Sequence, residues 1–189
     1  MRAAWNELTA EHRRWLLINA VLVTAVINGA ISAFIAWVLS ASEDEIPLLA
    51  APLVGGPSTI VDTVATLFIL PFITTLILTT VAWHEMRQGK LAPLLIDRNA
   101  DPLLARMPPK RARRGVYFGV LTVVLLAPVS VVLLVAFDFG DISVGDFVLY
   151  KTIFGILLGL VVTPPICIAA MTDREVAEVA RAGIEPATP

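Results

Sequence analysis

Four long runs of apolar residues alternate with stretches that are richer in polar residues. The runs cover residues 15–40, 58–83, 115–137 and 147–171, so each contains 23 to 26 residues. An α-helix of that length crosses about 30 Å of hydrocarbon, because it rises about 1.5 Å per residue. The pattern therefore predicts an all-α fold: an integral membrane four-helix antiparallel bundle that forms a single transmembrane domain over residues 1–189.

Small and weakly polar residues recur along one side of the first span. They are Thr24, Asn28 and Ser32, with Ala25, Gly29 and Ala33 beside them. Residues four positions apart share a helix face, so we expect this face to contact another span. The fourth span contains Gly155 and Gly159, a GxxxG pattern that permits close helix approach. Interhelical hydrogen bonds contribute about 0.6 to 2 kcal/mol, and we interpret Asn28 as a packing residue rather than a solute contact.

Two ionisable residues lie at similar depths in different spans. Asp62 is 21 residues from Trp83 at the far end of the second span, and Lys151 is 20 residues from Met171 at the end of the fourth. A charged side chain at the bilayer centre costs about 2.5 to 3.5 kcal/mol and less near the interface. Pairing the two charges would lower that cost.

Three interpretations of Asp62 are open from the sequence. Asp62 pairs with Lys151 and holds the second span against the fourth, or each side chain reaches the outer interface alone. In the third interpretation Asp62 binds a proton or cation, with Thr66 one turn further along and Asn28 deeper on a polar path. The candidate intramembrane polar site therefore comprises Asp62, Lys151, Asn28 and Thr66.

Basic residues gather on one side of the predicted membrane. The loop 84–114 contains eight Lys and Arg residues, whereas the connections 41–57 and 138–146 contain none and carry six acidic residues. Five further arginines flank the first and last spans: Arg2, Arg13, Arg14, Arg174 and Arg181. By the positive-inside rule, both termini and the basic loop 84–114 face the cytoplasm.

Two segments of the basic loop allow a specific prediction each, one of a lipid contact and one of a short helix. The run PPKRARRG at 108–115 provides candidate contacts to anionic lipid, namely Lys110, Arg111, Arg113 and Arg114. Basic residues beside a span also serve simply to orient it, and we expect no nucleic-acid partner. Pro102 suits the first turn of a helix, so we predict a short interfacial helix on the inner membrane surface.

Composition supports membrane insertion and gives little sign of catalysis. The chain is 57% apolar and 16% charged, with a mean hydropathy of +0.81. The segment WHEMR at 83–87 lacks the second histidine of a zinc-protease helix, and Cys167 is the single cysteine. No phosphate-binding loop, dinucleotide-binding glycine pattern or metal-spaced cysteine set occurs, so we expect no cofactor, no bound metal and no enzymatic activity.

The chain resembles small bacterial four-span inner-membrane proteins of uncharacterised activity. The resemblance lies in INAVLVTAVINGAISAFIAW and in PLVGGPSTIVDTVATLFILPFITTLILTT. Such proteins have an asparagine in the first span and a second span that opens with aspartate before a Thr, Phe and Leu-Pro pattern. The resemblance implies a multi-pass protein of the bacterial inner (cytoplasmic) membrane, and it implies no activity, cofactor or site residue.

Two functions fit these features. The first is a non-enzymatic membrane protein that acts by association, as an accessory or scaffold subunit or as a homo-oligomer. The alternative is a transporter or channel oligomer for a small solute, ion or proton that uses Asp62 and Asn28. Small-residue helix faces and the basic loop favour the first, because they suit contacts with helices and with the membrane.

Overall fold

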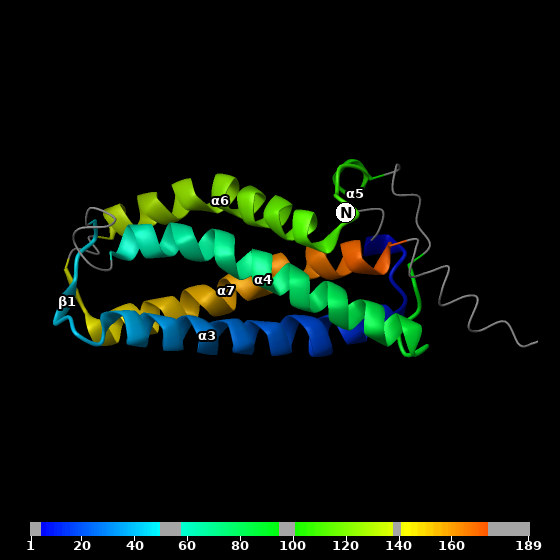
Figure 1. Ribbon diagram of the computed structural model, residues 1–189, viewed down its shortest axis with the longest axis horizontal. Helices are drawn as coiled ribbons and strands as arrows, with labels where there is room; N and C mark the ends of the chain where they lie inside the picture. Colours follow the sequence, from blue (N-terminus) through cyan, green and yellow to red (C-terminus); the bar gives the residue numbers. More distant parts are fainter. Residues whose placement is uncertain (1–4, 50–57, 95–100, 138–140, 174–189) are drawn as a thin grey trace, which may run out of the picture.

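Four long helices account for most of the chain. The computed structural model describes residues 5–49, 58–94, 101–137 and 141–173. Four helices in it are long and apolar enough to cross a membrane: Ala10–Ser40, Thr59–Arg87, Arg111–Ala136 and Val144–Met171. Each predicted span falls on one of them, so the prediction of four helices of spanning length is confirmed. They lie side by side along the long axis of the molecule (Figure 1).

The first long helix has three parts. These are α2 (Ala10–Arg14), the π-helical segment η1 (Trp15–Leu22) and α3 (Val23–Ser40). The hydroxyl of Thr9 accepts a hydrogen bond from the backbone N–H of His12 at 3.3 Å, which caps the start of α2. The His12 ring donates through Nε2 to the carbonyl oxygen of Ala92 at 2.8 Å. These contacts anchor the beginning of the helix to the segment that follows α4.

Serine residues cap two of the other long helices. Helix α4 (Thr59–Arg87) begins after Ser58, and α7 (Val144–Met171) begins after Ser143. Each serine hydroxyl accepts a hydrogen bond from a backbone N–H three residues ahead, at 3.3 and 3.2 Å. The first turn of each helix therefore starts with its N–H groups partly satisfied, as a helix entering hydrocarbon requires.

The predicted short helix in the basic loop is present. Helix α5 (Pro102–Ala105) has Pro102 in its first turn, and the Asp101 carboxylate accepts a hydrogen bond from the N–H of Leu103 at 3.1 Å. Helix α6 (Arg111–Ala136) follows closely. The position of α5 at a membrane surface stays a prediction.

The helices do not pack in chain order. Helix α3 packs mainly against α7, α6 packs mainly against α4, and α4 and α7 pack against each other. If α3 and α4 are taken as the first half of the chain and α6 and α7 as the second, the first helix of each half lies on the second helix of the other half. Helix α3 makes few direct contacts with α4, and α6 makes few with α7, so a groove is left between the members of each of these two pairs.

Glycines set the closest approaches between these helices. On α7, Gly155 and Gly159 face the small-residue side of α3, and a Cβ atom at Gly155 would lie 2.8 Å from the carbonyl oxygen of Asn28. On α6, Gly115 and Gly119 face the stacked rings of Phe72 and Phe68 on α4. We expected the small-residue face of the first span to contact another span, and in the structure it lies against α7. The two α6 glycines were not identified from the sequence.

A short β-pair departs from the all-α expectation. Strands β1 (Glu45–Ile46) and β2 (Ile142–Ser143) pair antiparallel and join the two outer connections. Ile46 is fully buried and shares a small cluster with Ala36 and Phe147. Two-residue strands carry too little alternation to be recognised in a sequence.

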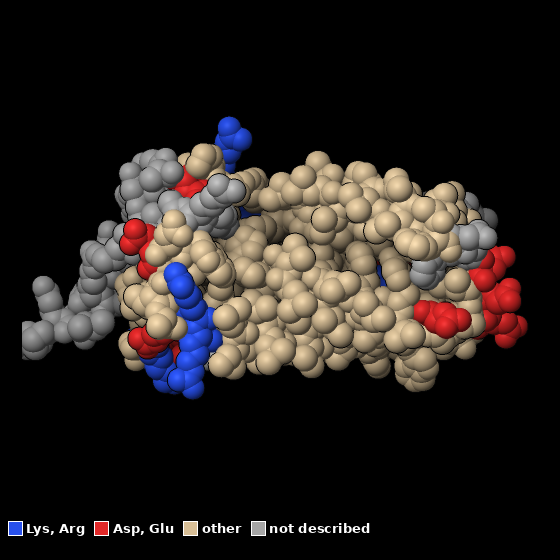
Figure 2. All heavy atoms as spheres, turned by 180° about the vertical axis from the view of Figure 1, so that it is seen from behind, with Lys and Arg blue, Asp and Glu red and all other residues tan. Residues whose placement is uncertain are grey.

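Charged side chains lie at the two ends of the molecule. Figure 2 shows acidic side chains at the end that carries β1, Lys and Arg together with acidic side chains at the opposite end, and a broad, mostly uncharged surface between. Many large apolar side chains are exposed in this middle region. Four of the basic residues used to predict orientation lie outside the described residues: Arg2, Arg98, Arg174 and Arg181.

Replacing Gly159 by alanine is expected to destabilise the fold by about 1–3 kcal/mol through overpacking. The new Cβ atom would lie 2.9 Å from the Cα atom of Ala25 and 3.0 Å from Nδ2 of Asn28. Gly145→Ala is the matched control, because its Cβ atom would meet nothing nearer than the Ser143 hydroxyl at 3.8 Å. Thermal unfolding of detergent-solubilised protein measures both. Equal midpoints for the two variants would contradict the close α3–α7 contact.

Candidate intramembrane polar site

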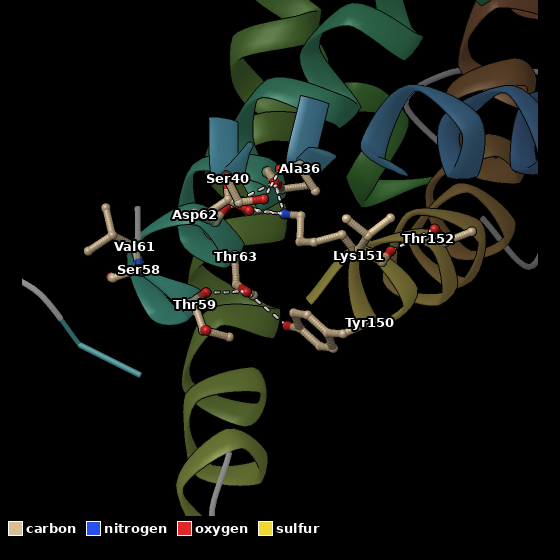
Figure 3. Close-up of polar contacts among 12 residues, drawn as sticks. Ala36, Ser40, Ser58, Thr59, Val61, Asp62, Thr63, Tyr150, Lys151 and Thr152 are labelled. Carbon is tan, nitrogen blue, oxygen red and sulfur yellow. Dashed lines mark hydrogen bonds and ion pairs between the residues drawn. The ribbon is translucent and has the colours of Figure 1, made fainter. Parts of the chain in front are cut away.

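The structure brings together Asp62, Lys151 and Thr66. Lys151 Nζ forms an ion pair with the Asp62 carboxylate and donates a hydrogen bond to the Thr66 hydroxyl. It also lies 3.4 Å from the backbone carbonyl oxygen of Asp62. An ammonium group has three donors, so these three acceptors satisfy it. Figure 3 shows Lys151 extending from α7 toward Asp62 in the first turn of α4.

The two members of the pair differ in exposure. The side chain of Lys151 is 2% exposed and that of Asp62 is 18% exposed. Beside them, the Tyr150 and Thr63 hydroxyls lie 2.8 Å apart, so a second polar contact joins α7 to α4 (Figure 3). Because its ammonium group is buried, Lys151 depends on α4 for its hydrogen-bond and charge partners. The site therefore holds two helices together.

Asn28 occupies a separate position from the charged pair. Its side-chain amide lies against the Thr74 hydroxyl, with N···O and O···O distances of 3.4 and 3.5 Å. Thr74 is twelve residues beyond Asp62 on α4, which is about 18 Å along a helix. Asn28 is 5% exposed. The contact bridges α3 and α4 near the middle of the two helices. Asn28 therefore lies too far from Asp62 to form one polar site with it.

A groove runs between α3 and α4. Its volume is about 330 Å³, and its lining includes Asn28, Thr74, Thr66 and Asp62. Most of the other lining residues are isoleucine and leucine. Three of the four candidate residues thus border one groove, even though only Asp62 and Thr66 are close to each other.

A second buried ion pair was missed by sequence reasoning. Arg114 donates to both carboxylate oxygens of Asp173, at 2.6 and 2.9 Å, and Trp83 Nε1 donates to the same carboxylate at 2.9 Å. Arg114 Nε also donates to the carbonyl oxygen of Pro108 at 3.3 Å. The cluster joins α4, α6 and the residue that follows the C-cap of α7. The signal in the sequence was limited to an aspartate just after the fourth span.

The four proposed anionic-lipid residues are not equivalent. Arg114 is fully buried, and its guanidinium makes its hydrogen bonds inside the protein. Lys110, Arg111 and Arg113 are exposed, and Arg111 donates to the Thr80 hydroxyl at 3.0 Å. Of the four residues proposed to contact anionic lipid, only Lys110, Arg111 and Arg113 present a basic side chain at the surface.

The chain was compared with protein-family models, with curated proteins and with solved structures, and none of them matches. Within the described residues, no group of three or more His, Cys, Asp or Glu side chains is arranged to hold a metal ion. Function must therefore be argued from the geometry of the helices.

Arg114→Gln is expected to lower the free energy of unfolding by about 3 kcal/mol, because it leaves the buried Asp173 carboxylate without its charged partner. Arg113→Gln is the matched control: it removes the same charge one position earlier, where the side chain is exposed. We expect the control to change stability by less than about 1 kcal/mol. Chemical denaturation in mild detergent gives both values, and similar losses would show that the buried pair adds little.

Proposed function

We propose that this protein is a multi-pass protein of the bacterial inner membrane that acts by association rather than by catalysis. Its four helices form one antiparallel transmembrane bundle, with both termini and the basic loop 84–114 in the cytoplasm. The separation of Lys and Arg from the acidic end supports this orientation (Figure 2). The role proposed is that of an accessory or scaffold subunit or of a homo-oligomer.

The outer half of α6 is the observation that carries this proposal. From residue 123 to residue 137, Leu134 is the one buried side chain. The glycine contacts to α4 involve only the other half of α6, at Gly115 and Gly119. Val123, Leu126 and Ala127 are half-buried against the core, so this part of α6 packs within the chain along one face only. The opposite face is exposed over about four turns, which is long enough for an interface between membrane helices.

Two residues in this part of α6 favour a protein neighbour over lipid. Pro128 has no N–H to donate to the carbonyl of Val124, four residues earlier. Ser130, two residues further on, adds a hydroxyl in the same half-helix. Helix association in membranes depends on packing and on interhelical hydrogen bonds, and a second copy or a partner helix supplies both.

The transport alternative has weaker support from the same geometry. Asp62 is neutralised by Lys151, and Asn28 is hydrogen-bonded to Thr74. Both residues assigned to a pathway are thus engaged in holding helices together. This engagement favours association over transport of a small solute, ion or proton.

Cysteine cross-linking in native membranes tests the proposed interface. Cys167 is the sole cysteine, so Cys167→Ser provides a background for Val124→Cys and Val132→Cys on α6. Val26→Cys on α3 is the matched control, because Val26, Val124 and Val132 are 60% to 64% exposed. We expect a thiol-attached benzophenone, which inserts into C–H bonds on illumination, to give a dimer or a larger adduct from the α6 positions and not from α3. Absence of any adduct at both α6 positions would contradict association through this face.

A further inference from the structure

Two rows of isoleucine form the walls of the groove between α3 and α4. Each helix contributes three residues at four-residue spacing: Ile27, Ile31, Ile35, Ile69, Ile73 and Ile77. All six side chains are 40% to 53% exposed, so they stand at the rims of the groove rather than in the core. Helices α3 and α4 both pack on α7, which holds the two rows apart.

Most of the hydrogen-bonding groups in the groove are engaged within the protein, whereas the buried Ser32 hydroxyl has no hydrogen-bond partner among the described residues. Asn28 and Thr74 are hydrogen-bonded to each other, and the Thr66 hydroxyl donates to the carbonyl oxygen of Asp62 at 2.8 Å while it accepts from Lys151. A polar occupant would have to replace these bonds in a medium that offers no others. The groove therefore favours an apolar occupant.

The dimensions of the groove favour a narrow occupant over a helix. Its lining extends from Thr24 to Leu39 on α3, which is about 22 Å at about 1.5 Å per residue. A helix of that length and about 10 to 12 Å in diameter occupies on the order of 2,000 Å³. The cavity is about 330 Å³, so a helix would stay outside the rims whereas a single aliphatic chain can enter. Filling the groove restores dispersion contacts to its walls.

Charge at the outer end of the groove selects a headgroup. Asp62 lines this end and keeps 18% of its side chain exposed, whereas its partner Lys151 keeps 2%. Glu43, Asp44 and Glu45 follow α3 at the same end and are exposed. Acidic side chains dominate this end of the molecule in Figure 2, and residues 41–57 contain no Lys or Arg. A cationic head is attracted there and an anionic head is repelled.

We propose that the groove between α3 and α4 is a lipid site that holds one aliphatic chain of a phospholipid with a primary ammonium head. The chain lies between the two isoleucine rows, and the ammonium group lies at the acidic outer end, toward the exposed Glu43, Asp44 and Glu45 rather than toward Asp62, which Lys151 neutralises. The site is distinct from the α6 face and goes beyond association.

Native mass spectrometry tests this site on protein exposed to equal amounts of phosphatidylethanolamine and phosphatidylglycerol. We expect the wild type to retain phosphatidylethanolamine in preference. Ile31→Trp and Ile73→Trp fill the groove with an indole from either wall and should lower the retained lipid about tenfold. Val26→Trp is the matched control, because Val26 is 60% exposed on α3 and does not line the groove. It should retain lipid like the wild type.

Equal lipid retention by the two wall variants and the wild type would overturn the site. Loss of a dimer in the wall variants, with lipid retention unchanged, would overturn it in favour of a second copy as occupant. A measurement on the wild type alone guards against variants that fail to fold: phosphatidylethanolamine should raise the thermal midpoint more than phosphatidylglycerol does. Equal stabilisation by the two lipids would overturn the assignment of the headgroup.

Discussion

A lysine ammonium that is buried in the second turn of a long apolar helix has to find its acceptors within the protein. Lys151 of α7 finds them on α4, in the Asp62 carboxylate, the Asp62 carbonyl and the Thr66 hydroxyl. At the other end of the same helix pair, Asp173 receives Trp83 of α4 and Arg114 of α6. Helices α4 and α7 are thus joined by an ion pair at one end and by the Trp83–Asp173 hydrogen bond at the other, and the other two long helices pack onto this central pair.

Glycine determines how far the outer helices follow the central pair. Helix α3 lies close to α7 where Gly155 and Gly159 leave room, and α6 lies close to α4 where Gly115 and Gly119 meet the two phenylalanine rings. Because α3 follows α7 rather than α4, a groove opens between α3 and α4. Because the α6 glycines lie in only one half of the helix, the other half packs less closely and leaves one face exposed. The groove and this exposed face of α6 are the two surfaces on which the functional proposals rest.

The apolar runs were sufficient to predict the four long helices, since length and hydropathy decide whether a segment can span a membrane. Counting residues from the helix ends also placed Asp62 and Lys151 at one depth, and the structure has them in contact. The depth of a residue along its helix, however, does not determine which direction its side chain faces around the helix axis. The sequence therefore did not indicate that Asn28 would meet Thr74, or that α3 would stand away from α4.

The buried arginine shows a different kind of gap. Arg114 lies in a run of four basic residues that all fit the positive-inside rule, and nothing in their spacing distinguishes the one that pairs with Asp173 from those that face solvent. Long-range partners of this kind depend on which helices are neighbours, and periodicity within one helix does not specify its neighbours. The two-residue strands escaped notice for a related reason, because their pairing joins residues about a hundred positions apart.

The packing of α4 against α7 depends most directly on Asp62 being a structural partner of Lys151. A double-mutant cycle tests it: the free energy of unfolding of the wild type, Asp62→Asn, Lys151→Met and the double variant, measured in the same detergent. We expect a coupling of more than about 1 kcal/mol. Asp62→Asn should be the more damaging single change, because it leaves the more deeply buried charge without a counterion. Effects that add within about 0.5 kcal/mol would contradict the account, and Asp62 would then be a free carboxylate at the end of the groove.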